Sequence, residues 1–277
     1  MKPAPFAYKK ARSLDEAIAL LGETDARLLA GGQSLIATLN MRLSSPKLLI
    51  DINGVGGLDH ISEEGGTVEI GALARHTQAE RSEVVAKHAP LITLAMPHIG
   101  HPAIRNRGTF GGSIAFADPA AELPACLLAL DGEVEATGPK GKRVIKAQDF
   151  FKGLFETALA PQEVLTAIRV PAARKNSRIG FAELARRHGD YAIVGLAASA
   201  LVDGRRLSNV RLSYFGVGNT AIRAKKAEAA LADGNVDAAV EALDLDPQDD
   251  IQASAKVRKH LAGVLLRRVS KQLLEAP

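Results

Sequence analysis

Short periodic blocks of apolar and polar residues in the first part of the chain predict alternating strands and helices. Ser13-Leu-Asp-Glu16 has the pattern of a capping box and opens a helix that Gly22 ends. The pattern then predicts a strand at Ala26–Ala30, a glycine turn, a helix from Ser34 to about Arg42, and a strand at Lys47–Ile52. Such a β–glycine turn–α–β unit is suited to binding phosphate.

The middle of the chain mixes strands and helices. Two strands between Leu58 and Ala72 flank Glu63-Glu-Gly-Gly66, which is a hairpin signal. Thr77-Gln-Ala-Glu80 has the pattern of a second capping box, and the helices predicted after it end near Pro97. The segment Gly100–Ala121 is rich in Gly and Pro and has no stable period. A long irregular segment in a compact domain is usually functional.

The pattern changes near residue 175, which predicts one domain over residues 1–175 and another over residues 176–277. Before this boundary, short strands follow Asp131-Gly132 and close with Val164–Val170. After it, three strands precede a purely helical segment, and Asp203-Gly204 predicts a tight hairpin between the last two strands. The strands are Arg178–Arg186, Ala192–Val202 and Arg205–Gly216, and the helices are Arg223–Ala232, Val236–Leu243 and Ala253–Leu274.

The composition is that of an ordinary soluble protein, with 47% hydrophobic and 24% charged residues among 277. Because there is no Trp and aromatic residues make up 4%, we expect a core of Ala, Leu, Ile and Val. The net charge of +4 is scattered, with local clusters only at Lys140–Arg143 and Arg174–Arg178, so it favours solvated loops over contact with nucleic acid or a membrane surface. The sequence shows neither a signal segment nor a membrane span, which predicts a cytoplasmic protein.

Cys126 is the only cysteine of the sequence and lies in the apolar run Leu123–Leu130. One thiol cannot hold an iron–sulfur cluster or form an internal disulfide, so we expect a buried, inert side chain. His98 and His101 are poorly spaced for metal binding and have no carboxylate or thiolate nearby in the sequence. We therefore expect no metal on this chain and no nucleophilic catalytic group.

Two glycine pairs, each followed by a hydroxyl residue, are the candidate binding elements: Ala30-Gly-Gly-Gln-Ser-Leu35 and Arg107-Gly-Thr-Phe-Gly-Gly-Ser113. Adjacent glycines permit positive φ, so consecutive backbone N–H groups can converge on an anion. The first turn alone is equally compatible with a tight strand-to-helix connection that binds nothing. Two such turns indicate a ligand with two phosphates. The G-x-G-x-x-G and phosphate-loop patterns are both absent, which disfavours NAD as the primary ligand and ATP hydrolysis.

Taken together, Ala30-Gly-Gly-Gln-Ser34 and Thr109-Phe-Gly-Gly112 resemble the paired flavin signature of FAD-binding subunits of molybdenum hydroxylases. That family includes the medium subunits of aerobic carbon monoxide dehydrogenase and the FAD domain of xanthine dehydrogenase. The segments at residues 117–124, 186–191 and 217–220 continue the resemblance in order. It implies an α+β protein with a vanillyl-alcohol-oxidase-type fold, in which two α/β subdomains clamp an extended FAD. A C-terminal domain with a three-stranded antiparallel sheet and a helical bundle follows.

The resemblance also implies the residues that bind FAD. Those of the first turn are expected to hold the pyrophosphate through backbone N–H groups, and Thr109, Gly112 and Ser113 to close on the diphosphate and the ribityl side. Gly111 more readily serves the turn geometry. The expected residues of the two turns are Ala30, Gly31, Gly32, Gln33, Ser34, Leu35, Thr109, Gly111, Gly112 and Ser113.

Outside the turns, the resemblance implies further contacts with FAD. Glu122 takes the place of an acid that bonds the adenosine ribose, whereas Asp118 either shares that role or, as we prefer, caps a helix that begins at Pro119. Tyr191 is expected against the isoalloxazine, with a core position as the alternative. Leu165 is expected, together with Val164, to pass near the flavin through backbone atoms. Glu183 stands where some relatives carry a Lys, which leaves the electrostatic surroundings of the flavin open.

The resemblance implies an oxidoreductase subunit that transfers electrons. A molybdopterin centre in a large subunit hydroxylates the substrate, [2Fe–2S] clusters in a small subunit relay electrons, and FAD on this chain passes them to quinone, NAD or oxygen. A dimer of heterotrimers is expected, with no catalytic residue of the hydroxylation on this chain. A self-contained flavin oxidoreductase of the same fold and a non-catalytic assembly protein remain alternatives. The hydroxylated substrate and the electron acceptor stay open.

Overall fold

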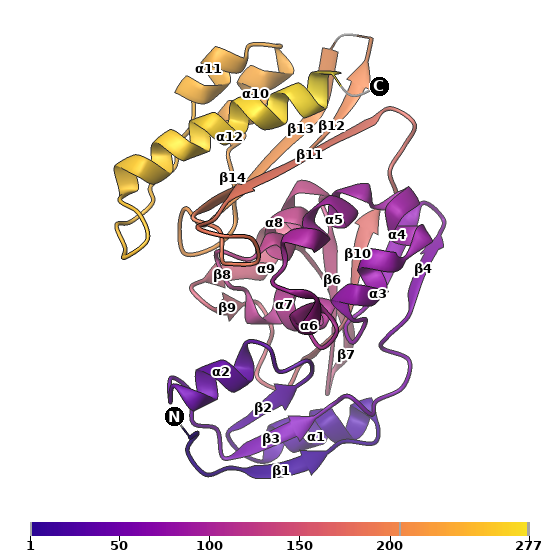
Figure 1. Cartoon of the computed structure of the whole chain (residues 1–277). Coiled ribbons are helices and arrows are strands. Elements are labelled where there is room, and N and C mark those ends of the chain that lie inside the picture. The colour runs from indigo at the N-terminus through magenta and orange to yellow at the C-terminus, as the bar shows by residue number, and fades with distance from the viewer. Residues whose placement is uncertain (1, 205, 276–277) are drawn as a thin grey trace.

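A three-stranded parallel sheet forms the N-terminal unit in the computed structural model, which describes residues 2–204 and 206–275 (Figure 1). The strands lie in the order β1-β3-β2, and the elements are β1 (Ala7–Lys10), α1 (Leu14–Glu23), β2 (Ala26–Leu29), α2 (Leu35–Asn40) and β3 (Leu48–Asp51). Ser13 caps α1 as predicted, since its hydroxyl accepts from the N–H of Glu16 at 3.1 Å. The sequence pattern missed β1 because all four of its side chains are exposed.

The second unit is a five-stranded antiparallel sheet in the order β4-β5-β10-β6-β7. Gly65 and Gly66 both have positive φ (58° and 81°), and they form the hairpin that the sequence predicts. Across the sheet, Arg169 pairs with Glu69 at 2.6 Å and with Glu135 at 2.8 Å, which links three neighbouring strands. The strands are β4 (Ile61–Glu64), β5 (Thr67–Gly71), β6 (Glu133–Gly138), β7 (Gly141–Lys146) and β10 (Val164–Pro171).

Short helices cover this sheet, and they correct two predictions. The capping box at Thr77–Glu80 is wrong: α3 begins at His76, and the side chain of Gln78 accepts from the N–H of Arg75 at 2.6 Å. The segment at 100–121 is not irregular throughout, because it contains α6 and α7. The elements are α3 (His76–Arg81), α4 (Glu83–His88), α5 (Pro90–Ala95), η1 (Met96–His98), α6 (Pro102–Arg105), α7 (Phe110–Phe116), α8 (Glu122–Ala129), α9 (Ala147–Phe150), β8 (Phe151–Gly153) and β9 (Glu156–Thr157).

The C-terminal unit is an antiparallel sheet in the order β11-β12-β13-β14. The three predicted strands are present, and the sheet gains a fourth strand, β14, whose two residues are too few to leave a pattern. Arg205, where one predicted strand began, lies outside the described residues. The elements are β11 (Ser177–Leu184), β12 (Val194–Asp203), β13 (Arg206–Phe215), β14 (Ile222–Arg223), α10 (Lys225–Ala232), α11 (Val236–Glu241) and α12 (Ala255–Glu275).

Apolar side chains join the C-terminal sheet to the middle unit. Helices α10 and α12 pack on β11–β13 in the outer layer, while α5 and α8 pack on the same strands from the middle unit (Figure 1). Phe181 and Phe215 stack with ring centroids 5.9 Å apart and belong to the buried cluster of the middle helices. Ala, Leu, Ile and Val dominate the buried side chains, as the composition predicts, and Cys126 lies among them with a pKa that burial raises. No helix within residues 2–204 and 206–275 combines the length and apolarity needed to cross a membrane.

We expect Tyr214→Phe to destabilise the C-terminal unit modestly. Tyr214 is fully buried, and its hydroxyl donates to the carbonyl of Ala262 in α12 at 3.0 Å. Loss of one buried hydrogen bond without loss of volume should lower the free energy of unfolding by about 1 kcal/mol. Urea unfolding of the purified chain measures the difference, and an unchanged midpoint would contradict this role of the hydroxyl.

Candidate functional site

The first glycine turn carries a row of free backbone donors. It connects β2 to α2, and Gly32 takes a positive φ of 73° that favours glycine. The N–H groups of residues 32–35 donate to no acceptor in the described part of the chain. The side chain of Gln33 folds back and donates to the carbonyl of Gly31 at 3.1 Å, which stiffens the turn. Consecutive free N–H groups of this kind form an anion-binding nest.

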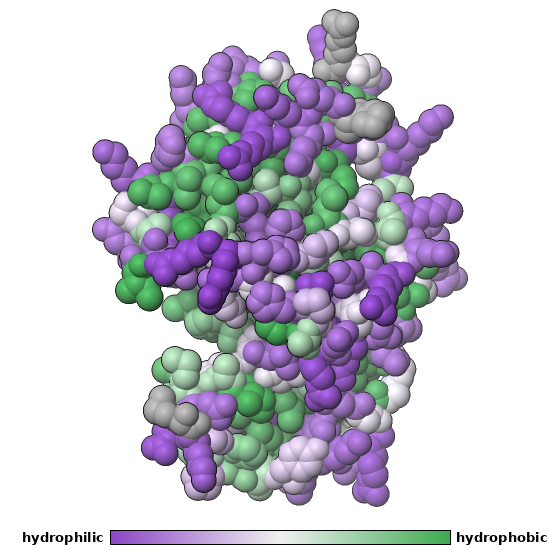
Figure 2. Space-filling view, viewed as in Figure 1, coloured by the Kyte–Doolittle hydropathy of each residue, from purple (hydrophilic) through white to green (hydrophobic). Residues whose placement is uncertain are grey.

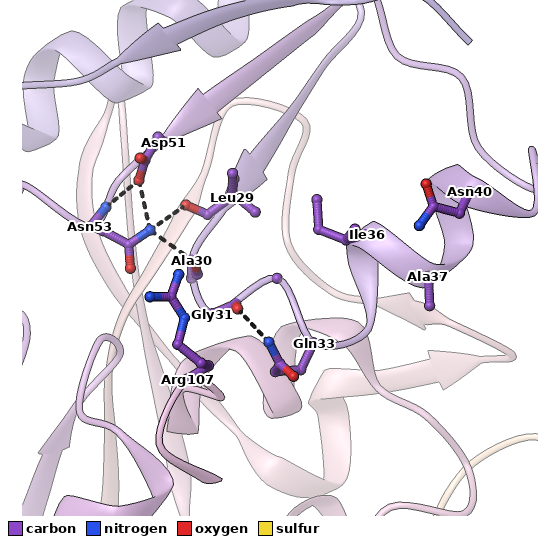
Figure 3. Close-up of a pocket in the computed structure, with 11 residues that line it drawn as sticks. Leu29, Ala30, Gly31, Gln33, Ile36, Ala37, Asn40, Asp51, Asn53 and Arg107 are labelled. Carbon is purple, nitrogen blue, oxygen red and sulfur yellow. Dashed lines mark hydrogen bonds between the residues drawn. The ribbon is translucent and has the colours of Figure 1, made fainter. Parts of the chain in front are cut away.

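A cavity of about 530 Å³ opens at this turn (Figure 3). The turn forms one wall, α2 contributes a second, and the end of β3 together with Arg107 closes the others. Figure 2 shows a notch on this side of the molecule between the N-terminal unit and the remainder. The lining residues are Leu29, Ala30, Gly31, Gly32, Gln33, Ile36, Ala37, Asn40, Asp51, Asn53 and Arg107.

Four polar lining residues were missed by the sequence analysis, namely Asn40, Asp51, Asn53 and Arg107. A signal for Asp51 exists in hindsight: β2 and β3 pair in parallel with Leu29 opposite Asp51, so the end of β3 must lie beside the glycine turn. The parallel neighbour of a strand that ends in a glycine turn is therefore a place to search for ligand-binding side chains. Arg107 is the first residue of the second motif, whose pattern assigns it no role.

The second glycine turn differs from the first and corrects a prediction. The N–H of Phe110 donates to the carbonyl of Ala74 at 2.8 Å, and the N–H of Gly111 donates to the carbonyl of Ala72 at 2.9 Å. The N–H of Gly112 donates to the hydroxyl of Thr109 at 3.1 Å, which caps α7. These donors serve the fold, so the second turn is not an anion nest like the first.

Close backbone packing explains the glycine at position 111. A Cβ there would lie 2.6 Å from the Cβ of Ala72 and 2.7 Å from its Cα. The expectation that Gly111 serves geometry agrees with this packing. Thr109 is 2% exposed, whereas Gly112 and Ser113 are partly exposed. Within the second turn, Gly112 and Ser113 therefore offer a surface that a ligand could contact.

The two turns touch each other through backbone atoms. A Cβ on Gly31 would lie 2.3 Å from the carbonyl oxygen of Arg107 and 2.8 Å from the Cα of Gly108. A polar bridge reinforces the contact: the side chain of Asn53 donates to the carbonyl of Ala30 at 2.9 Å and accepts from Arg75 at 2.7 Å. Arg75 in turn donates to the carbonyl of Arg107. The bridge fixes the first turn relative to the second.

Positive charge and a neutral imidazole lie behind the turns. Burial and then the charge of Arg107 lower the pKa of Arg75, which shows that two guanidinium groups share this region. Burial lowers the pKa of His76 to about 4, so its ring is neutral and its Nε2 lies 3.0 Å from the carbonyl of Thr109. The site therefore favours an anionic ligand.

A second cluster, formed by Asp118, Glu122, Glu183 and Tyr191, carries acidic and phenolic groups. Burial raises the pKa of Glu122 to about 8, and the charge of Glu183 raises it further in the same direction. Burial also raises the pKa of Tyr191 to about 12, with the charges of Asp118 and Glu122 adding to it. The hydroxyl of Tyr191 lies by the hydroxyl of Ser34, so this acidic cluster borders the first glycine turn.

One expectation about this region is corrected, and the alternative considered for Tyr191 is excluded. Asp118 does not cap a helix at Pro119: α8 begins at Glu122, and the carboxylate of Asp118 accepts from the N–H of Ala120 at 2.9 Å in a local turn. Tyr191 is not a core residue, because 53% of it is exposed. Leu165, by contrast, is buried in β10 and does not line the cavity.

Glu183 has one satisfied and one unsatisfied oxygen. Its Oε1 lies 3.2 Å from Nδ1 of His98, while its Oε2 is buried without a partner among the described residues. His98 also packs on Phe181 with ring centroids 5.0 Å apart. Within residues 2–204 and 206–275, no three His, Cys, Asp or Glu side chains are placed to hold a metal ion.

Comparison with known proteins matches nearly the whole chain. The family model described as the FAD binding domain in molybdopterin dehydrogenase matches residues 4–173, and that of the CO dehydrogenase flavoprotein C-terminal domain matches residues 179–273. The 6-hydroxypseudooxynicotine dehydrogenase complex subunit alpha of Paenarthrobacter nicotinovorans is 40% identical over 99% of this chain and 96% of its own length. The carbon monoxide dehydrogenase medium chain of Hydrogenophaga pseudoflava is 36% identical over 97% of this chain and 96% of its own length.

The fold comparison agrees. A chain in the solved structure of carbon monoxide dehydrogenase from Hydrogenophaga pseudoflava superposes with a TM-score of 0.96 at 37% identity, covering 99% of this chain and 98% of the other. The α+β fold and its nest thus define a flavoprotein component of an oxidoreductase. The chain belongs to the family of FAD-binding medium subunits of molybdenum hydroxylases, and its cofactor is FAD.

The residues present fit this cofactor. FAD carries a diphosphate, and the nest at residues 32–35 offers free N–H groups beside the guanidinium of Arg107. The cradle is built from glycine at Gly31 and Gly32, where a larger residue would meet backbone or strain φ.

We expect Gly31→Ala to separate the two turns. The new methyl group would collide with the backbone of Arg107 and Gly108, which cannot move without disturbing α7. The free energy of unfolding should fall by about 1–3 kcal/mol, the usual range for overpacking. Gly56→Ala is the matched control, because its Cβ would meet no atom within 4 Å. Denaturant unfolding of both variants tests the contact, and equal stability would contradict it.

The buried carboxyl of Glu122 predicts a pH dependence of stability in the flavin-free chain. Its pKa is about 8 in the folded protein against 4.5 ordinarily, so between these values the folded state holds the extra proton. Stability must then fall as the pH rises from about 4.5 to about 8. Glu122→Gln removes this loss. The variant's free energy of unfolding should therefore exceed that of the wild type by a difference that grows to the order of a few kcal/mol near pH 8. Urea unfolding across this pH range measures the difference between the variant and the wild type, with Glu64→Gln at an exposed position as the control. A difference that does not change with pH would contradict a protonated, buried Glu122.

Proposed function

We propose that this chain is the electron-transferring FAD subunit of a heterotrimeric molybdenum hydroxylase. The observation that carries the proposal is the row of free N–H groups at residues 32–35, open to a cavity that Arg107 closes. FAD supplies the ability to accept electrons singly and release them in pairs, while the protein positions it and sets its electrostatic surroundings. The chain's own residues thus bind and orient the cofactor.

The N–H groups of residues 32–35 bind the diphosphate, and Ala30 and Gly31 shape the approach. Arg107, which also lines the cavity, neutralises part of its charge from beside the turn. From the second turn, Gly112 and Ser113 contribute surface and a hydroxyl, and Thr109 supports them as the cap of α7. In this arrangement the first two units act as the two subdomains of a vanillyl-alcohol-oxidase-type fold that holds an extended FAD between them.

Tyr191 and Glu122 serve the isoalloxazine end. The ribose role that the resemblance gives Glu122 fits its surroundings less well, because Glu122 lies with Tyr191 and Glu183 and does not line the cavity. A carboxyl that stays protonated near neutral pH can donate one hydrogen bond and accept another, which suits the polar edge of a flavin ring. Asp118 shapes the loop before α8, and Leu165 contributes backbone close to the ring.

The electrons come from partner subunits. Cys126 is buried and alone in the sequence, so [2Fe–2S] clusters must lie on another chain. The relatives are named as a medium chain and as a subunit of a dehydrogenase complex, and one solved relative is described as lacking the Mo-pyranopterin moiety of its molybdenum cofactor. We therefore place molybdopterin on a large subunit and the clusters on a small one, in a dimer of heterotrimers, with quinone, NAD or oxygen as acceptor.

The proposed boundary between the two domains lies near residue 175. It falls between the two family matches and in the connection from β10 to β11. A cytoplasmic location remains a prediction of the sequence.

Two alternatives keep the fold but change the role. A self-contained flavin oxidoreductase would purify from its source without molybdenum or iron, whereas the proposed subunit brings both. A non-catalytic assembly protein would have a damaged nest and would refuse added FAD. The intact row of free N–H groups disfavours that alternative. Metal analysis of the native complex, captured through a tag on this chain, separates these readings.

We expect Gly32→Asp to abolish FAD retention. The substitution places a carboxylate against the diphosphate at a residue whose φ of 73° strains any side chain. Gly57→Asp is the matched control, since its φ is 79° and its side chain would meet open space away from the cavity. The flavin absorbance per protein after gel filtration should fall at least tenfold in Gly32→Asp and stay at the wild-type value in Gly57→Asp. Retention by Gly32→Asp would refute the placement.

A further inference from the structure

Asp51 is the acid placed beside the nest. It is the last residue of β3, and the parallel register sets it opposite Leu29, directly before the glycine turn. Among the described residues that line the cavity, it alone carries a carboxylate. Figure 3 shows Asp51 and Asn53 at the end of β3, on the same wall as Ala30.

Hydrogen bonds hold this carboxylate ionised and oriented. The hydroxyl of Tyr8 donates to its Oδ2 at 2.6 Å, while the backbone N–H and the side chain of Asn53 donate to its Oδ1 at 2.8 and 2.7 Å. Partial burial would raise the pKa of Asp51, but the bonds from Tyr8 and Asn53 outweigh burial and lower it. An ionised carboxylate is a pure acceptor, and Oδ2 has one lone pair left beside the bond from Tyr8.

We infer that Asp51 binds the ribose hydroxyls of the adenosine half of FAD. The inference rests on the proposed function, because it takes the diphosphate to lie in the nest at residues 32–35. An adenosine ribose is one ester link away from that diphosphate, and the cavity continues from the nest to Asp51. Vicinal hydroxyls are donors that a carboxylate oxygen accepts, and an acid at the end of the next parallel strand reads ribose in other β–turn–α–β nucleotide sites.

The remaining walls suit the base. Leu29, Ile36 and Ala37 give the cavity apolar surface on β2 and α2, and Asn40 lies at the end of that surface. A purine ring buries its faces against such side chains and presents polar edges to an amide. Asn53 positions Asp51 and does not itself face the hydroxyls, since its donors and acceptor are engaged by Ala30, Asp51 and Arg75.

The test compares ADP with 2′-deoxy-ADP on the flavin-free full chain by calorimetry. The wild type should prefer ADP by roughly 10-fold or more, the usual effect of one hydrogen bond to a charged group. Asp51→Ala should reduce this ratio to about 1 and weaken ADP binding by roughly 10- to 100-fold. Asp59→Asn, at an exposed position outside the cavity, is the control and should keep the wild-type ratio.

The outcomes are distinguishable. A wild-type chain that binds neither FAD nor ADP overturns the proposed function itself. A wild-type chain that binds FAD but does not distinguish ADP from 2′-deoxy-ADP overturns the assignment to Asp51 and leaves the proposed function in place. This outcome is measured on the wild type, so it does not depend on whether a variant folds. If the preference for ADP over 2′-deoxy-ADP is lost in Glu122→Gln but kept in Asp51→Ala, the assignment to Asp51 is overturned and Glu122 is the residue that binds the ribose.

Discussion

Gly31 and the peptide of Arg107 and Gly108 lie in direct backbone contact, and the geometry of the site depends on that contact. One turn belongs to the small parallel sheet and the other to the helices over the antiparallel sheet. Only glycine allows the two backbones to approach this closely. The bridge from Asn53 to Arg75 adds polar bonds across the same junction. A ligand along the first turn therefore meets walls from both units.

The two glycine turns are similar in sequence but have different roles in the structure. The first keeps its N–H groups free and faces the cavity, while the second uses its own to dock α7 on the residues after β5. The difference arises from their neighbours: the carbonyls of Ala72 and Ala74 lie within reach of the second turn, and no acceptor in the described residues lies within reach of the first. The first turn can therefore offer hydrogen-bond donors to an anion, whereas the donors of the second turn are already used by the fold.

Basic and acidic side chains lie in different parts of the site. Arg75 and Arg107 lie at the nest, and Glu122 with Glu183 lies beyond Ser34 and Tyr191. The positive side suits an anionic group, while on the acidic side burial, and after it the charge of Glu183, raises the pKa of Glu122 and keeps its carboxyl protonated near neutral pH. Glu183 comes from β11 of the C-terminal unit, so that unit contributes a carboxylate to the acidic cluster.

The sequence by itself determined the order of most elements, the hairpin at Gly65 and Gly66, the make-up of the core and the family, because these depend on local periodicity and on contiguous motifs. It could not show that the first glycine turn has free N–H groups and the second does not, because this depends on which backbone carbonyls the fold brings near each turn. It also missed β1, β14 and the polar wall of the cavity. Asp51 and Asn53 carry no motif, and their place beside the first turn follows only from the parallel pairing of β2 with β3, a contact between residues distant in the chain.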